Sequence, residues 1–247
     1  MVADIERLVL SGCYERVNML MSMFQAPRLR RLAAEKAQGG VVADLGAGPG
    51  YTALEDCRAS RGLVVLVDAS PAMLSIASAM LESECAGMHV EVAGLFEALP
   101  LPDCSVDAVT ATFSLRDAID REAAVREAAR ILKPNGRLVV VDLYRPRGRL
   151  ALALARLYFT IVPVLGAIIA GCPRQARSYL GLQSTLPRME TLEGMKALLS
   201  RYFRRVEAIK PLPSTGIWVA EEPIAGCGHP GREGLLQEGR DNSSVTR

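Results

Sequence analysis

The sequence has little histidine, few aromatic residues and almost no excess of one charge. Lys and Arg number 29 against 27 Asp and Glu, and the formal net charge is +2. A dedicated nucleic-acid binder carries a basic surplus that this chain lacks, so no nucleic-acid partner is expected. Two histidines and six cysteines without a Cys-x-x-Cys pair form no recognisable metal site or nucleophilic constellation. The sequence therefore predicts no bound metal.

The cysteines also stand far apart along the chain. They are Cys13, Cys57, Cys85, Cys104, Cys172 and Cys227. This spacing favours reduced thiols in a cytoplasmic protein. The chain starts Met-Val-Ala-Asp-Ile-Glu-Arg, with acidic residues where a signal peptide needs a basic start and an apolar run. Both observations predict a cytoplasmic location.

Apolar runs of strand length alternate with helical patterns through most of the 247 residues. Strands are expected at 41–45, 63–67, 88–92, 106–111, 136–143, 205–210 and 217–221, and helices within 1–38 and at 71–84 and 120–132. Strands that alternate with helices predict a parallel sheet covered on both faces. The last two strands are expected to flank a loop that contains Pro211, Pro213 and Gly216.

The same patterns predict a single domain over residues 1–225. Its N-terminal helices occupy 1–38, and a helical insertion on the substrate side occupies 144–204. From residue 226 to 247 the chain is rich in glycine and polar residues, and too poor in apolar side chains to pack. We expect a disordered tail there.

The stretch 150–172 is long and apolar enough to cross a bilayer, with Arg156 as its single charge. Pro163, Gly166 and the strands expected after it argue instead for a buried or surface-lying helix. Three arginines precede it within five residues, at 145, 147 and 149. An apolar face beside a basic one favours peripheral attachment to anionic membranes, so residues 145–172 are predicted to contact a membrane.

A glycine-rich loop, Asp-Leu-Gly-Ala-Gly-Pro-Gly at 44–50, ends one strand and opens a helix. A dinucleotide fingerprint would need its third glycine at Tyr51, but that glycine comes one residue earlier, at Gly50. The loop is instead similar to motif I of class I S-adenosylmethionine-dependent methyltransferases. Asp68, at the end of the next strand, suits a carboxylate that accepts hydrogen bonds from both ribose hydroxyls.

Four further segments narrow the resemblance. They are Tyr-Glu-Arg-Val-Asn-Met-Leu-Met-Ser at 14–22, Leu-Pro-Leu-Pro-Asp-Cys-Ser-Val-Asp-Ala-Val at 99–109, Phe-Ser-Leu-Arg-Asp at 113–117 and Arg-Ile-Leu-Lys-Pro-Asn-Gly-Arg-Leu at 130–138. Together they resemble the ubiquinone/menaquinone biosynthesis C-methyltransferase family over about residues 8–222. The resemblance implies an α/β, Rossmann-like class I methyltransferase fold: a mostly parallel seven-stranded sheet, helices on both faces and an N-terminal helical lid.

The resemblance also implies the ligands and the residues that bind them. S-adenosyl-L-methionine is the expected cofactor, and a reduced, lipophilic isoprenoid quinone precursor is the expected substrate. The expected cofactor-binding residues are Asp44, Gly46, Ala47, Gly48, Pro49, Gly50, Asp68, Ala69, Leu95, Phe96, Thr112 and Phe113. The expected catalytic residues are Arg116, which stabilises a developing phenolate, and Tyr14 and Asn18, which orient the quinol oxygens. A homodimer is a further expectation.

Several positions depart from the family pattern. Leu95 stands where members usually carry Asp or Asn, which leaves the backbone N–H of Phe96 to meet the adenine ring. Ala26 and Leu29 replace a His and a Trp, and Asp117 replaces an Asn. The segment Asp-Leu-Tyr at 142–144 replaces Glu-x-Ser. These departures indicate a divergent member whose aromatic substrate differs from a standard quinone precursor.

Other interpretations of these residues stay open. For Arg116 the alternative is an ion pair with Asp117 or Asp120, and for Tyr14 and Phe113 it is packing in the core. At the level of the whole protein, the alternatives are methylation of another small apolar or aromatic substrate, a nicotinamide-dependent oxidoreductase, and a catalytically silent cofactor-binding protein.

Overall fold

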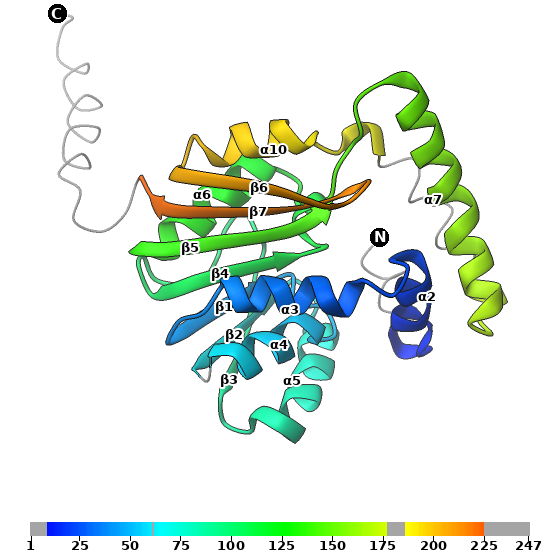
Figure 1. Cartoon of the computed structure of the whole chain (residues 1–247). Coiled ribbons are helices and arrows are strands. Elements are labelled where there is room, and N and C mark those ends of the chain that lie inside the picture. The colour runs from blue at the N-terminus through cyan, green and yellow to red at the C-terminus, as the bar shows by residue number, and fades with distance from the viewer. Residues whose placement is uncertain (1–8, 61, 177–185, 225–247) are drawn as a thin grey trace, which may run out of the picture.

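The computed structural model of the chain describes residues 9–60, 62–176 and 186–224. Its centre is a seven-stranded sheet in the order β3-β2-β1-β4-β5-β7-β6 (Figure 1). The strands are β1 (Val41–Leu45), β2 (Leu63–Asp68), β3 (His89–Ala93), β4 (Val106–Thr112), β5 (Leu132–Leu143), β6 (Phe203–Leu212) and β7 (Thr215–Pro223). Every pairing from β3 to β5 is parallel, and β7 is antiparallel to both of its neighbours. The predicted mostly parallel seven-stranded sheet is confirmed.

Helices cover both faces of the sheet, because its inner strands are apolar on both sides. The helices are α2 (Cys13–Met21), α3 (Ala26–Lys36), α4 (Tyr51–Ser60), α5 (Pro71–Cys85), α6 (Arg121–Ile131), α7 (Arg149–Ile169) and α10 (Leu192–Leu199), with the short turns η1 (Leu115–Asp117), η2 (Pro173–Gln175) and η3 (Leu186–Arg188). Val42 packs with Leu29 and Ala33 of α3, whereas the next residue, Ala43, belongs to the core shared with α6 and α10. Successive residues of β1 therefore pack into two separate cores, one on each face of the sheet.

Side-chain caps explain why two of the predicted helices begin where they do. The Ser70 hydroxyl accepts a hydrogen bond from the Met73 backbone N–H at 3.2 Å, and Pro71 occupies the first helical position of α5. The Asp120 carboxylate accepts hydrogen bonds from the backbone N–H groups of Glu122 and Ala123 at the start of α6. Asp120 therefore acts as a helix cap.

The two closing strands are longer than the sequence predicts, and the loop between them is shorter. Pro211 lies within β6, which is an edge strand whose register with β7 shifts between Ile209 and Leu212. An edge strand tolerates proline because one side of its backbone makes no ladder bonds. Gly216 lies within β7, where a Cβ atom would come within 2.4 Å of the Trp218 ring. Close packing within a strand, and not the expected turn, thus requires glycine at this position.

Helices α2 and α7 lie next to each other beyond the ends of the strands (Figure 1). A disulfide joins Cys13 in α2 to Cys172 just after α7. Among the described helices, only α7 is long and apolar enough to cross a membrane. In its most apolar stretch of 18 residues, 28% of the helix is buried inside the protein. β5 before it and β7 after it pair in one sheet, which agrees with the predicted buried or surface-lying helix.

The prediction of reduced thiols is wrong. Besides Cys13 and Cys172, a disulfide joins Cys57 to Cys85, and Cys104 is disulfide-bonded as well. The Cα atoms of the two pairs lie 6.1 and 6.5 Å apart, although 159 and 28 residues separate them in sequence. Wide sequence spacing therefore said nothing about spatial pairing. Without the thiol argument, the cytoplasmic location stays a prediction.

Two further predictions fall partly or wholly outside the described residues. The predicted tail at 226–247 lies outside them, and so does part of the insertion predicted at 144–204.

Among the described residues, no group of three or more His, Cys, Asp or Glu side chains could hold a metal ion.

Candidate active site

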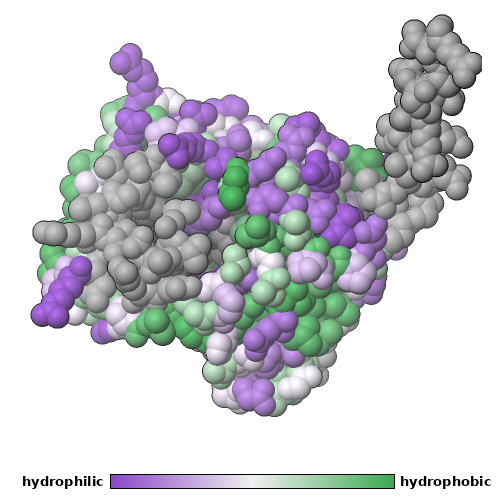
Figure 2. Space-filling model, turned by 180° about the vertical axis from the view of Figure 1, so that it is seen from behind, coloured by the Kyte–Doolittle hydropathy of each residue, from purple (hydrophilic) through white to green (hydrophobic). Residues whose placement is uncertain are grey.

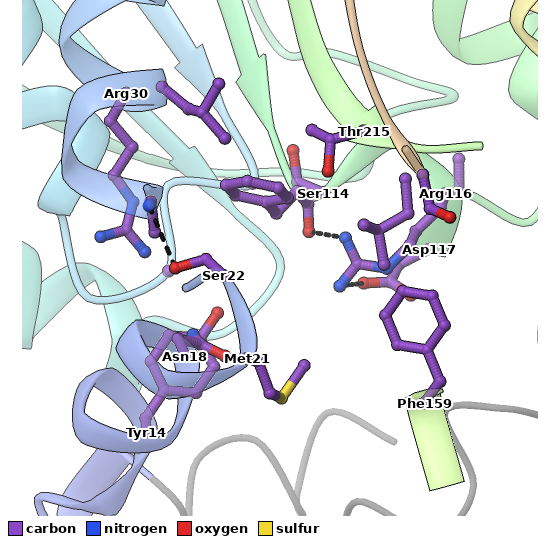
Figure 3. Close-up of a pocket in the computed structure, with 18 of the residues that line it drawn as sticks. Tyr14, Asn18, Met21, Ser22, Arg30, Ser114, Arg116, Asp117, Phe159 and Thr215 are labelled. Atoms are coloured by element: carbon purple, nitrogen blue, oxygen red, sulfur yellow. Dashed lines mark hydrogen bonds and ion pairs between the residues drawn. The ribbon is translucent and has the colours of Figure 1, made fainter. Parts of the chain in front are cut away.

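A cavity of about 1110 Å³ opens where the parallel strands end. Its lining includes Gly46 after β1, Asp68 at the end of β2, Phe113 after β4 and Leu143 at the end of β5. β1 and β4 are the neighbouring strands at which the strand order reverses. Ligands of open α/β sheets bind at this switch point. Figure 3 shows side chains from α2, α3, η1 and α7 around the same space.

One wall of the cavity, called here the glycine-loop side, is lined by Gly46, Gly48 and Pro49 of the loop at 46–50, by Asp68 and Ala69 at and just after the end of β2, and by Leu95 and Phe96. Gly46 has φ of 71°, and a Cβ atom there would lie 2.6 Å from the Ser114 Cβ. Gly50 has φ of 91°, and its Cβ would lie 2.9 Å from Ala77. Gly48 has φ of 52° and lines the cavity, and its Cβ would meet no other atom closer than 3.9 Å. Two glycines thus permit close packing, and the third leaves open a space beside the loop.

The Asp68 carboxylate is fixed by its own turn. Its Oδ2 atom accepts a hydrogen bond from the Gly48 backbone N–H at 2.8 Å, and its Oδ1 atom accepts one from the Ser70 N–H at 2.8 Å. Asp68 lines the cavity, and each carboxylate oxygen has a further lone pair. The arrangement can accept two more hydrogen bonds from a diol.

The predicted cofactor residues divide into two groups. The group that lines the cavity comprises Gly46, Gly48, Pro49, Asp68, Ala69, Leu95, Phe96 and Phe113. The other group, Asp44, Ala47, Gly50 and Thr112, does not contribute to the lining. The hydroxyl of Thr112 bonds instead to that of Thr52.

Arg116 lines the opposite wall, and a buried carboxylate holds it there. Asp142, 1% exposed, accepts hydrogen bonds from the Arg116 backbone N–H at 2.9 Å and from Nη1 at 3.0 Å. Nη1 also donates to the Phe113 carbonyl, and Asp117 lies 3.7 Å from Nη2 (Figure 3). Burial alone would lower the pKa of Arg116, but the charges of Asp142 and Asp117 raise it above its ordinary value. Arg116 is therefore a fixed cation.

The helical side of the cavity, which comprises α2, α7 and Arg116, includes the other predicted catalytic residues. Tyr14 and Asn18 of α2 line the cavity together with Phe159 of α7 (Figure 3). Tyr158 of α7 lines it as well. The Tyr158 hydroxyl donates a 2.6 Å hydrogen bond to the Met21 carbonyl. The structure thus brings Tyr14, Asn18 and Arg116 to one cavity, next to an apolar wall.

Among the residues of the site that the sequence-based set leaves out, Arg30, Asp142 and Tyr158 make the interactions that matter most for its geometry. Arg30 of α3 lines the cavity, pairs with Glu15 of α2 at 2.7 Å and stacks 4.9 Å above the Tyr51 ring. Its side chain is only 8% exposed. The one signal in the sequence is that Arg30 lies four residues from both Ala26 and Ala34, on the apolar face of a helix, where a solvated arginine would not lie.

Comparison with known proteins gives a family match over residues 2–205, to the ubiE/COQ5 methyltransferase family. Ubiquinone/menaquinone biosynthesis C-methyltransferase UbiE from Hahella chejuensis is 32% identical over 192 residues, which cover 74% of this chain and 76% of that protein. The protein of the same name from Edwardsiella ictaluri is 35% identical over 201 residues, which cover 76% of this chain and 77% of that one.

Solved structures support the fold. An S-adenosylmethionine-dependent methyltransferase from Aquifex aeolicus superposes with a TM-score of 0.55 at 15% identity and covers 80% of this chain and 89% of its own. The [4+2]-cyclase SpnF superposes with a TM-score of 0.56 at 20% identity and covers 81% of each chain. Because a cyclase shares the fold, the fold by itself does not fix the reaction.

Proposed function

Because the chain belongs to the ubiE/COQ5 methyltransferase family and is an S-adenosylmethionine-dependent methyltransferase, we propose that it methylates a ring carbon of a reduced, demethylmenaquinol-like isoprenoid quinone precursor. The observation that carries this proposal is that one cavity joins the glycine-loop side to an apolar wall and a fixed arginine. The first side suits a nucleoside, and the second suits a lipophilic phenol.

On the glycine-loop side, Asp68 accepts hydrogen bonds from the two ribose hydroxyls of the cofactor. Leu95 and Phe96 meet the adenine ring, which receives backbone and apolar contacts because Leu95 has no polar side chain. Gly46 and Gly48 would hold the methionine part of the cofactor, and the Arg30 guanidinium would pair with its carboxylate. The open space beside Gly48 supports this fit.

When bound, S-adenosylmethionine supplies an electrophilic methyl group, which the ring carbon attacks while the carbon–sulfur bond breaks to leave S-adenosylhomocysteine. Arg116 stabilises the phenolate oxygen whose charge activates that carbon. Tyr14 and Asn18, one helical turn apart on α2, hydrogen-bond to the quinol oxygens and orient the ring. The ring carbon then loses its proton to water, which restores the aromatic ring.

The experiment is mass spectrometry of products from the purified protein, S-adenosylmethionine with a deuterated methyl group and a short-chain demethylmenaquinol kept reduced. We expect one labelled methyl per ring and one S-adenosylhomocysteine per methyl. The oxidised quinone should give none, since it has no phenol to ionise. Methylation of another phenol but not of any quinol would replace this proposal with the broader alternative, a methyltransferase of small aromatic substrates.

The proposed substrate dissolves in membranes, and α7 supports a membrane contact through residues 145–172. Six large apolar side chains, spaced three or four residues apart, form one exposed stripe on it. They are Leu150, Leu154, Leu157, Ile161, Leu165 and Ile168, each between 44% and 75% exposed. On the opposite face, Ala155 and Phe159 are buried. α7 therefore links the cavity wall to an apolar surface.

The charges near this stripe are fewer than the sequence suggests. Arg147 and Arg149 are exposed at the start of α7, and Arg147 pairs with Glu193 at 3.3 Å. Arg145 is half-buried, and among the described residues its Nε atom is buried without a hydrogen-bond partner. Seen from behind, hydrophobic surface also reaches the edge of the molecule on the α7 side (Figure 2). Apolar contact is thus the larger contribution to membrane binding, and the two exposed arginines add a modest preference for anionic lipid.

Flotation with vesicles that contain phosphatidylglycerol tests the contact. We expect binding that Leu154→Ser with Leu157→Ser and Ile161→Ser abolishes, and that Arg147→Gln with Arg149→Gln only weakens. Leu63→Ser with Val90→Ser, at exposed apolar residues of β2 and β3, is the matched control and should bind normally. If the protein does not float and sediments as a dimer that the serine variant dissociates, the stripe binds a second copy, which would agree with the homodimer prediction, and the membrane contact is wrong.

A further inference from the structure

Two buried carboxyl groups face each other behind the glycine loop, across one hydroxyl group. Asp44 comes from β1, Asp56 from α4 and Thr110 from β4. The Thr110 Oγ atom lies 2.6 Å from Asp56 Oδ2 and 3.3 Å from Asp44 Oδ1. Both aspartates are 1% exposed and Thr110 is fully buried. Neither Asp56 nor Thr110 has a role in the proposed reaction.

If both aspartates are ionised, the three side chains have too few hydrogens to form both of these hydrogen bonds. A threonine hydroxyl has one hydrogen, and the shorter contact assigns it to Asp56. The Thr110 oxygen and Asp44 Oδ1 would then meet as two acceptors with no hydrogen between them. A proton on Asp44 completes the chain, because Asp44 then donates to Thr110, which donates to Asp56.

Two more atoms indicate the same shortage. Among the described residues, Asp44 Oδ2 and Asp56 Oδ1 are buried without a hydrogen-bond partner. Two desolvated carboxylates side by side would also repel each other, and one retained proton removes that repulsion. Burial raises the pKa of Asp44 to about 7 and raises that of Asp56 well above its ordinary value.

The surrounding side chains place little positive charge near the two carboxyl groups. Besides each other, the charged groups that act on the pair are Asp68 from β2 and Glu55 from α4, which are anionic, and Arg30 from α3. Arg30 is already paired with Glu15. A positive charge that entered the cavity would therefore be the main new stabilisation of a second carboxylate. Asp44 lies two residues before Gly46, whose backbone lines that cavity.

We propose that Asp44, Thr110 and Asp56 together hold one exchangeable proton in the free enzyme, and that binding of the cationic cofactor expels it to solvent. The inference rests on the cofactor placement given above, but not on the identity of the methyl acceptor. The cofactor carries a sulfonium and an ammonium against one carboxylate, so it favours the doubly ionised pair. Its affinity then rises as the pH rises through neutrality, because less work is needed to remove the proton. Asp56 is thus a positioning residue that acts through Asp44.

Calorimetric titration of the full chain with S-adenosylmethionine in buffers of different ionisation enthalpy measures the released proton. At about pH 6.5, where the cofactor amine is already protonated and Asp44 is mostly protonated, we expect release of most of one proton per cofactor. S-adenosylhomocysteine has the same amine but no sulfonium charge and should release much less. Asp56→Asn keeps the size and can donate to the Thr110 oxygen, which frees the Thr110 hydrogen for Asp44, so this variant should release almost none. Glu82→Gln, at an exposed carboxylate on α5, is the matched control and should release as much as the unaltered protein.

Two results would overturn the proposal: no release by the unaltered protein between about pH 6 and 8, or equal release by Asp56→Asn. If Asp56→Asn does not fold, infrared difference spectra of the unaltered protein decide instead. The carbonyl band of a protonated carboxylic acid should then disappear when the cofactor binds, and its persistence would contradict the proposal. Failure to methylate a quinol would leave both measurements unaffected.

Discussion

On the glycine-loop side of the cavity, Asp68 is held by backbone N–H groups of its own turn and of the loop beside it. On the helical side, Arg116 depends on Asp142, a side chain from another strand, and Tyr158 reaches back to α2. The first arrangement follows from backbone conformation, and the second from side-chain partners distant in sequence. Variants should therefore separate cofactor binding on one side from substrate handling and stability on the other.

The largest effect is expected from Arg116→Ala. Removal of the guanidinium leaves the Asp142 carboxylate buried without its ion-pair partner, which costs about 3 to 5 kcal/mol of unfolding free energy. Urea denaturation measures this loss, and a second change, Asp142→Asn, should recover part of it. In Arg116→Lys, which keeps the charge, turnover should fall while cofactor affinity stays near normal. A loss below about 1 kcal/mol in Arg116→Ala would show that Asp142 is not dependent on Arg116.

The two disulfides compare the sides directly. Cys13→Ser with Cys172→Ser frees α2 from α7, whereas Cys57→Ser with Cys85→Ser loosens α4 from α5. Each pair should lose about 2 to 4 kcal/mol of stability. Only the first should raise the KM for the quinol and speed hydrogen exchange in α2, because only α2 and α7 line the substrate end. Equal changes in KM for both pairs would remove the distinction between the two sides.

Asp68→Ala should lower cofactor affinity and leave stability near normal. Each ribose hydrogen bond to the carboxylate is worth about 1.5 to 3 kcal/mol, so loss of both should lower cofactor affinity by more than about a hundredfold. Calorimetry measures the affinity, with Glu91→Ala on β3 as an exposed control. Unchanged affinity in the folded Asp68→Ala variant would take Asp68 out of the site.

The smallest effect is expected from Tyr158→Phe. This change removes one hydrogen bond, to the Met21 carbonyl, at a cost of about 1 kcal/mol. The KM for the quinol should rise several-fold and cofactor affinity should not change. A change in cofactor affinity as large as the change in KM would mean that α7 also controls the glycine-loop side.

The sequence predicts the glycine-loop side well, because local patterns determine it. β1 spans 41–45 as predicted, and Gly46 and Gly48 have the positive φ angles that only glycine adopts easily. The helical side depends on contacts between distant residues, which no local pattern encodes. By local pattern alone, Asp142 is therefore a mere departure from the family segment, Arg30 carries no motif, and the partners of Cys13 and Cys57 cannot be predicted.

The same limit explains the errors at the end of the sheet and behind the loop. Pro211 indicates a turn by its residue type, but an edge strand with a shifted register accommodates it. Asp56 lies on a short helix and carries no motif, so its position opposite Asp44 emerges only from the packing of α4 on the sheet.

The central claim is that the two sides of the cavity together place a methyl group on a ring carbon of a reduced quinone. Its most direct test is nuclear magnetic resonance of the product formed from S-adenosylmethionine that carries a carbon-13 methyl group. We expect a single labelled methyl resonance in the region of ring-bound methyl groups, formed only while the quinone is kept reduced. A resonance in the methoxy region, or cofactor binding without any labelled quinone, would contradict the account.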